Sequence, residues 1–217
     1  MQANTRKLCV LAMMSALAFI LAAYIRIPIV LFLRYDPKDV IIVIAGFIFG
    51  PLAAFGVTVV VSLMQMLTGV SQTGYIGLVM NIIASTAFCC TAAFIYKRKR
   101  TFKGALFGLI IGGIVATIVM MMWNYIIAPL FMEMTREAIV GLLLTAFLPF
   151  NLISNGLNII FTLLLYKRVK VVLHVMRMTP QSEEANGSGV SRKSITMFLL
   201  FIGLTCALWV LILLGVI

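Results

Sequence analysis

Long apolar runs separated by short polar stretches form the main pattern along this chain. Six runs are long enough to cross roughly 30 Å of hydrocarbon as helices. They cover approximately Leu8 to Tyr24, Leu52 to Leu67, Ile76 to Tyr96, Ala105 to Leu130, Ala146 to Tyr166 and Ile195 to Ile217. A shorter apolar run spans Val40 to Phe49. All have the length of helices rather than the alternation of barrel strands, so the pattern predicts an all-α integral membrane protein.

Gly50 and Pro51 separate the short run from the run that follows it. Proline is best tolerated in the first turn of a helix, so we expect one helix to end here and another to begin. The predicted fold is a six-helix bundle with a short second helix, plus one additional C-terminal transmembrane helix. Residues 1–172 form the predicted core, 173–193 a polar cytoplasmic linker and 194–217 the additional helix.

Composition and charge agree with this class. The chain is 63% hydrophobic and 11% charged, and its mean hydropathy of +1.16 exceeds that of soluble domains. If the spans alternate in direction, most basic residues that produce the net charge of +11 fall on one side, including Arg6, Lys7 and the run Lys97 to Arg100. This side is predicted to be cytoplasmic, with the N-terminus on it. Because these charges flank spans in a lipid bilayer, we expect no binding of nucleic acid.

The sequence contains little that would support catalysis. Its single histidine, His174, lies in a basic segment, and neither a Gly-x-Ser-x-Gly elbow nor a Walker motif is present. The four cysteines lack the spacing of a metal site, so we expect no metal. No acidic residue lies deep inside a predicted span, which argues against an ion-coupled transporter. We therefore expect a binding protein and not an enzyme, and any ATP-driven step requires a partner.

Polar side chains inside the apolar runs indicate a binding site. Asn151, Ser154, Asn155 and Asn158 lie at positions i, i+3, i+4 and i+7, so in a helix they share one face. One such asparagine alone is explained equally well by an interhelical hydrogen bond worth roughly 0.6 to 2 kcal/mol. The cluster is better explained by a ligand, because amides offer a donor and an acceptor side by side. The ring edge of a flavin, pterin or purine requires this pairing.

Other residues near the outer ends of the spans are expected to converge on the same cavity. The polar ones include Asn81 and Asn124. Apolar walls would come from aromatic residues near span ends, although such residues more often form an interfacial belt. The candidates are Trp123, Tyr125, Phe147, Phe150 and Tyr75.

Four strings along the chain resemble one known family. They are LRYDPKDV at Leu33 to Val40, GFIFGPLAA at Gly46 to Ala54, MWNYIIAPLFM at Met122 to Met132 and REAIVGLLLTAFLPFNLISNGLN at Arg136 to Asn158. In this order they resemble the substrate-binding S components of energy-coupling factor (ECF) vitamin transporters, particularly the riboflavin-specific branch. The resemblance covers about residues 5–170.

The resemblance implies a high-affinity riboflavin-binding subunit of an ATP-driven uptake transporter in the bacterial cell membrane. Such a subunit captures the vitamin near the extracellular face. It works with a transmembrane coupling protein and two cytoplasmic ATPase subunits, and riboflavin is its substrate rather than a cofactor. The resemblance implies that Asn124 and Asn151 bind riboflavin and that the loop around Tyr35 and Asp36 closes the outer mouth. The remaining expected substrate-binding residues are Ser154, Asn155, Asn81 and Tyr75.

Two further features bear on the family's function. Ala12 and Ala16 match the small-xxx-small face that docks the coupling protein, although alone they would be interpreted as packing residues. The riboflavin branch typically has FNLIKGGLN, whereas this chain has Ser154 and Asn155 in place of lysine and glycine. Neutral polar groups would thus replace a cationic contact. An S component for another vitamin or flavin-like precursor therefore stays open, as does a non-transport membrane scaffold whose asparagines only join helices.

Overall fold

The computed structural model describes residues 2–30, 33–71, 74–132 and 135–175. The predicted additional helix at 194–217 and most of the linker lie outside these residues. The described elements are α1 (Gln2–Tyr24), β1 (Ile27–Val30), β2 (Leu33–Tyr35), α2 (Lys38–Phe49), α3 (Pro51–Leu67), α4 (Gly74–Ser85), the π-helical η1 (Thr86–Cys90), α5 (Thr91–Arg98), α6 (Phe102–Met132), α7 (Arg136–Leu142), the π-helical η2 (Leu143–Phe147) and α8 (Leu148–Val175).

The arrangement is a bundle of helices, which confirms the predicted all-α membrane fold. The segments α4, η1 and α5 form one continuous helix, and so do α7, η2 and α8, so the described residues form six rods. Four rods contain stretches long and apolar enough to cross a membrane, namely Thr5–Tyr24, Gly74–Arg98, Phe102–Pro129 and Arg136–Tyr166. The second rod, α2, has 12 residues and is about 18 Å long at the usual rise, as expected for a short helix.

The turn between α2 and α3 has the form predicted from its two residues. Gly50 has a φ of 94°, in the left-handed region that glycine tolerates, and Pro51 opens α3. The backbone N–H of Gly50 donates to the carbonyl of Gly46 at 2.8 Å and closes the last turn of α2. The short helix therefore ends where the sequence predicts.

A β-hairpin connects α1 to α2, although the apolar pattern of the sequence predicts only helices. Strands β1 and β2 pair antiparallel, with Ile27 opposite Tyr35 and Pro28 opposite Arg34. The pairing is irregular between Pro28 and Val30, and proline cannot donate a hydrogen bond to a ladder. Strands this short carry no clear alternating pattern, so the sequence does not predict them. The register buries Tyr35, while its neighbour Arg34 is exposed.

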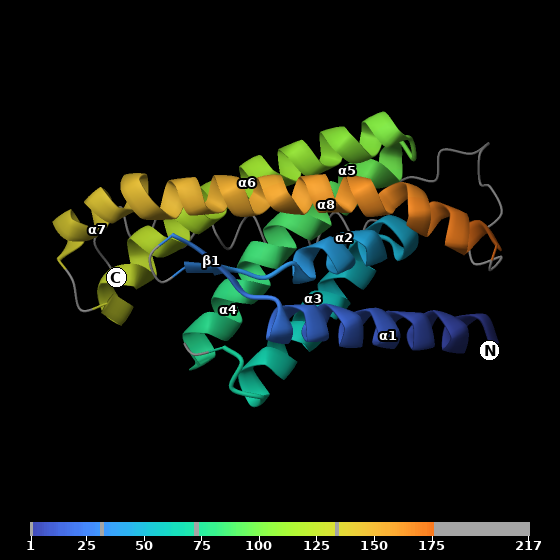
Figure 1. Ribbon diagram of the computed structural model, residues 1–217, viewed down its shortest axis with the longest axis horizontal. Coiled ribbons are helices and arrows are strands. Elements are labelled where there is room, and N and C mark those ends of the chain that lie inside the picture. The colour runs from blue at the N-terminus through green and yellow to red at the C-terminus, as the bar shows by residue number, and fades with distance from the viewer. Residues whose placement is uncertain (1, 31–32, 72–73, 133–134, 176–217) are drawn as a thin grey trace.

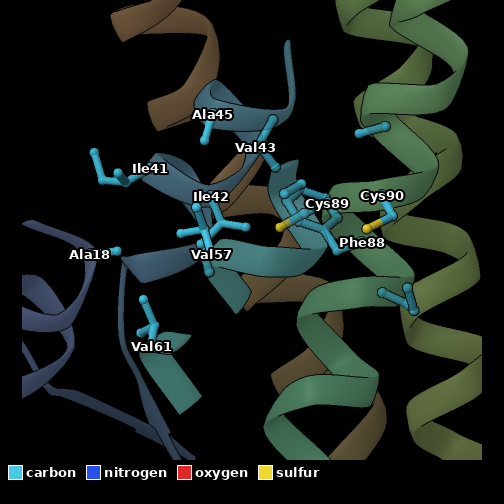
Figure 2. Packing of buried hydrophobic residues seen from close by; sticks show 14 of the residues in the cluster. Ala18, Ile41, Ile42, Val43, Ala45, Val57, Val61, Phe88, Cys89 and Cys90 are labelled. Carbon is cyan, nitrogen blue, oxygen red and sulfur yellow. The ribbon is translucent and has the colours of Figure 1, made fainter. Parts of the chain in front are cut away.

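The hydrophobic core surrounds α2, which packs against α1, α3, η1 and α8 (Figure 1). Figure 2 shows Ile42 and Val43 of α2 among Val57 and Val61 of α3 and Phe88 of η1. Six consecutive residues of this helix, Val40 to Ala45, are buried. A helix that is apolar on every side belongs inside a bundle, so this short helix becomes its centre.

Glycines allow α6 to approach η1 and α5 closely. A Cβ atom on Gly108 would lie 2.8 Å from the carbonyl oxygen of Ala92, and one on Gly112 would lie 2.7 Å from that of Phe88. Both oxygens are backbone atoms, so neither can move aside without shifting a helix. The absence of a side chain at these two glycines therefore lets α6 pack directly against the backbone of the rod formed by α4, η1 and α5.

We expect Gly112→Ala to destabilise the bundle by about 1–3 kcal/mol, because the added methyl forces α6 away from Phe88. Gly56→Ala in α3 is a matched control, since a Cβ there meets nothing within 4 Å. Thermal unfolding of both variants in detergent measures the effect. Equal melting temperatures for the two variants would show that the close approach does not contribute to stability.

The two ends of the bundle differ in character. The start of α1, the connection between α5 and α6 and the end of α8 lie at one end (Figure 1). There the hydroxyl groups of Tyr96 and Tyr166 are 2.7 Å apart, and the ring of Phe47 packs 4.3 Å from that of Tyr96. The basic residues of the described α1, α5 and α5–α6 connection lie toward this end, including Arg6, Lys7 and the run Lys97 to Arg100.

Candidate functional site

A cavity of about 500 Å³ lies between the hairpin and the ends of the helices. Its lining includes Arg26 between α1 and β1, the last turn of α3 at Gln65, the first turn of α4 at Ile76 and the start of α8 at Phe150. These positions are all at the end opposite the Tyr96 and Tyr166 pair. The volume falls in the range of about 300–1,000 Å³ that is usual for small-molecule sites.

The cavity brings together seven of the eight substrate-binding residues predicted from the sequence. They are Tyr35, Asp36, Asn81, Asn124, Asn151, Ser154 and Asn155. Asn158 lines it too, so the polar face of α8 deduced from the spacing is directed into the cavity. Among the expected aromatic walls, Trp123, Phe147 and Phe150 also line it.

Tyr75 departs from the prediction. It is 78% exposed in the first turn of α4, and the cavity lining begins at the next residue, Ile76. Neighbouring residues on a helix point about 100° apart, so a shift of one position along the sequence changes which side chain faces the cavity. Tyr125 is also absent from the lining and packs against the cluster of Ala128, Ile139 and Leu143.

The hairpin is joined to α8 by one buried hydrogen bond. The hydroxyl of Tyr35 donates to Oδ1 of Asn158 at 2.8 Å, although the two residues are 123 positions apart. Burial raises the pKa of the Tyr35 phenol, and the negative charges of Asp39 and Asp36 act in the same direction. The phenol therefore stays protonated at neutral pH and remains a donor. This contact places β2 over the cavity.

A buried lysine, which the sequence analysis did not identify as a site residue, anchors the other side of the cavity. Lys38 is 2% exposed, and its Nζ donates to Oε1 of Gln65 and Oδ1 of Asn81, each at 2.8 Å. Asp36 Oδ2 lies 3.4 Å from the same Nζ and accepts from Nε2 of Gln65 at 3.1 Å. The acceptors compensate for burial of the cation. The signals that could have revealed this network are a glutamine inside an apolar run and a lysine at the start of one.

Lys38 also changes the interpretation of Ser154. The expectation was that neutral groups replace a cationic contact in the cavity. Lys38 and Ser154 both line the cavity, so a cation is present on a different element. Beside this network, Ser85 of α4 donates to a carboxylate oxygen of Asp39 at 2.6 Å and ties α4 to the first turn of α2.

Several polar groups of the lining lack a partner within the described part of the chain. The Oγ of Ser154 and the Nε1 of Trp123 are buried and make no hydrogen bond to the described residues. Asn124, a residue only 8% exposed, also lines the cavity. A buried donor or acceptor without a partner costs about 1–3 kcal/mol. A polar ligand in the cavity would remove this cost.

Local backbone geometry helps to place the α8 residues. The π-helical η2 ends just before Pro149, which has no N–H to continue a regular helical ladder. Asn151 Nδ2 donates to the carbonyl of Phe147 at 2.8 Å. One turn further on, Asn155 Nδ2 lies 3.1 Å from Oγ1 of Thr117 and connects α8 to α6. π-helical segments are frequent at functional sites.

Comparison with known proteins agrees with the geometry. The family described as ECF transporter, substrate-specific component, matches residues 6–166. The riboflavin transporter RibU of Staphylococcus aureus is 35% identical, over 78% of this chain and 92% of the relative. RibU of Streptococcus thermophilus is 33% identical, over 78% and 85% of the two chains. The riboflavin transporter FmnP of Bacillus subtilis is 31% identical, over 76% and 92%.

The fold is also similar to a solved structure of the S component of a bacterial ECF transporter. The TM-score is 0.67 at 34% sequence identity, and the similarity covers 78% of this chain and 98% of the other. The matched residues 6–166 include every described residue of the cavity lining. This chain therefore belongs to the family of substrate-specific S components of ECF transporters.

Proposed function

We propose that this chain is the riboflavin-binding subunit of an ATP-driven ECF uptake transporter. The observation that carries the proposal is a cavity of about 500 Å³ lined by amide side chains, in a chain whose relatives are named riboflavin transporters. Asn124 and Asn151 bind the polar edge of the flavin ring. Trp123, Phe147 and Phe150 contact its apolar faces.

The proposed orientation places the cavity at the extracellular face of the bacterial cell membrane. The basic residues gather at the opposite end of the bundle, beside the start of α1. The positive-inside rule makes that end, and the N-terminus with it, cytoplasmic. Vitamin then enters from outside, over the hairpin that carries Tyr35.

ATP-driven uptake requires partners, and α1 offers the proposed docking face for the transmembrane coupling protein. Ala12 and Ala16 are exposed, whereas Ser15 and Ala18 on the other side of the helix are buried in the bundle. Small exposed side chains let a second helix approach closely. Two cytoplasmic ATPase subunits complete the proposed transporter and supply the nucleotide chemistry.

We expect the purified protein to quench riboflavin fluorescence in a saturable way, because the flavin ring stacks against Trp123 and the phenylalanines of the cavity. The measurement is a titration of flavin-free protein in detergent, preceded by a search for flavin absorbance in protein purified from riboflavin-containing culture. Free tryptophan at the same concentration is the control for collisional quenching. A folded protein with neither bound flavin nor saturable quenching would contradict the proposal.

Ser154 favours testing a second ligand class in the same titration. Its hydroxyl is buried without a partner in the described residues, so it suits a ligand with a polar atom at that position. Other flavins, pterins and purines therefore serve as competitors. Stronger binding of one of these would identify an S component for a different heterocycle, and binding of none would favour a scaffold without transport function.

A further inference from the structure

We infer that Lys38 holds Asn81 in one orientation, so that Asn81 donates a hydrogen bond from Nδ2 to an acceptor atom of the bound ligand. Lys38 is then a positioning residue that sets the ligand specificity of the cavity without contacting the ligand. The inference rests on the proposed function, because it takes the ligand to be a flavin-like heterocycle.

The orientation of Asn81 follows from the chemistry of its neighbour. The oxygen and nitrogen of an amide are often assigned only from surrounding hydrogen bonds. An ammonium group is a donor only, so the Asn81 atom 2.8 Å from Lys38 Nζ must be the oxygen. The NH₂ group has no partner among the residues that the structure describes, and Asn81 lines the cavity. Asn81 therefore has its oxygen bound to Lys38 and its NH₂ group left for a ligand.

Lys38 itself has little freedom to turn away. Its Nζ donates to Gln65 and Asn81, each at 2.8 Å, and forms an ion pair with Asp36 at 3.4 Å. Gln65 is held in turn by its bond to Asp36 at 3.1 Å. Because the ammonium makes two hydrogen bonds and an ion pair and the residue is only 2% exposed, it acts on the ligand through Asn81.

Two amides of the opposite wall have the reverse orientation for the same reason. Asn151 Nδ2 donates to the carbonyl of Phe147, and Asn155 Nδ2 donates to the carbonyl of Gly113 at 3.3 Å. Carbonyl oxygens only accept, so the nitrogen of Asn151 points to Phe147, that of Asn155 points to Gly113, and both oxygens are left for the cavity. Asn158 on the same helix has the opposite orientation, because its Oδ1 accepts from Tyr35.

A ligand that satisfies these three amides presents an acceptor toward Asn81 and an N–H donor toward Asn151 or Asn155. A flavin ring has this combination, because its ring nitrogens and carbonyl oxygens accept and its imide N–H donates. The inference thus specifies which edge of the heterocycle faces Asn81. It also predicts that heterocycles with only donors on that edge are rejected.

The test compares Asn81→Asp and Asn81→Leu with the wild-type protein in riboflavin titrations. Both substitutions remove the donor, and the carboxylate introduced by the first would remain paired with Lys38, so the fold should persist. We expect each variant to bind riboflavin about 10-fold or more weakly, as for loss of one buried hydrogen bond. Weakening by aspartate but not by leucine would attribute the effect to charge and overturn the inference.

A second measurement separates the positioning role of Lys38 from a structural one. The ligands are riboflavin analogues in which one ring nitrogen is replaced by C–H or one carbonyl oxygen by sulfur. The analogue that lacks the contacted acceptor should bind the wild-type protein about 10-fold more weakly than riboflavin does. The Asn81→Leu variant should bind this analogue and riboflavin with equal affinity. The double variant Lys38→Met with Asp36→Asn, which leaves no unpaired buried charge, should lose the same discrimination although Asn81 is present.

Two results would overturn the inference. If the affinity of each analogue relative to riboflavin were the same in wild type and in all the variants, Asn81 would not contact the ligand. If the Lys38 double variant kept the wild-type discrimination, Lys38 would not orient Asn81. Failure of wild-type protein to bind any flavin would instead overturn the proposed function, and this inference with it.

Discussion

Asn151→Leu is expected to abolish high-affinity riboflavin binding while leaving the bundle folded. The Asn151 side chain is largely buried in the cavity wall, and its nitrogen is engaged by Phe147, which leaves the oxygen for the ligand. Leucine has a similar size but offers no acceptor, so a donor of the ligand is buried without a partner. That costs about 1–3 kcal/mol, and a loss of affinity approaching 100-fold is expected by fluorescence titration.

The matched control is Thr145→Leu on the same rod. Thr145 is exposed and its hydroxyl already donates to the carbonyl of Gly141 at 2.8 Å, so leucine there should face lipid and leave binding unchanged. Size-exclusion chromatography and thermal unfolding report whether each variant is folded. Wild-type affinity in a folded Asn151→Leu protein would exclude Asn151 from the site.

Ala12→Trp should have the opposite profile, with riboflavin binding intact and uptake stopped. Ala12 lies on the exposed side of α1 and away from the cavity lining. An indole there would hold a docking helix several ångströms away, which removes the packing on which helix association in membranes depends. The measurements are uptake of labelled riboflavin by cells that contain the ATPase subunits, and titration of the purified variant.

Met13→Trp serves as the control for bulk on α1. Met13 is 72% exposed and already large, so tryptophan at this position should reduce uptake much less. If Ala12→Trp lost binding as well as uptake, α1 would be required for the fold of the cavity rather than for docking. Equal uptake by the two variants would show that close approach at Ala12 is not needed.

Features encoded in adjacent residues could be predicted from the sequence. Gly50 and Pro51 marked the end of α2 and the start of α3, because each residue has its own backbone preference. The face shared by Asn151, Ser154 and Asn155 follows from helical periodicity alone, and it does line the cavity. The predicted linker and additional C-terminal helix remain predictions.

Features that depend on distant partners could not be predicted in this way. Lys38 meets Gln65 and Asn81, which lie 27 and 43 positions further along the chain, and no local pattern connects them. Periodicity shows which residues share a helix face but not which neighbour the face meets. Tyr75 illustrates the same limit, since only the packing of α4 shows that Ile76 and not Tyr75 is directed inward.

The hydrogen bond between Tyr35 and Asn158 has a consequence for how long a vitamin molecule stays bound. Asp36 is bound to both Lys38 and Gln65, whereas Tyr35 next to it has one hydrogen bond to α8. A bond of this kind is worth only about 1 kcal/mol, so an appreciable fraction of molecules would have this contact open at any moment. The dwell time of the vitamin would then be governed by the amides and rings around it, and opening of the hairpin would not limit the rate of dissociation.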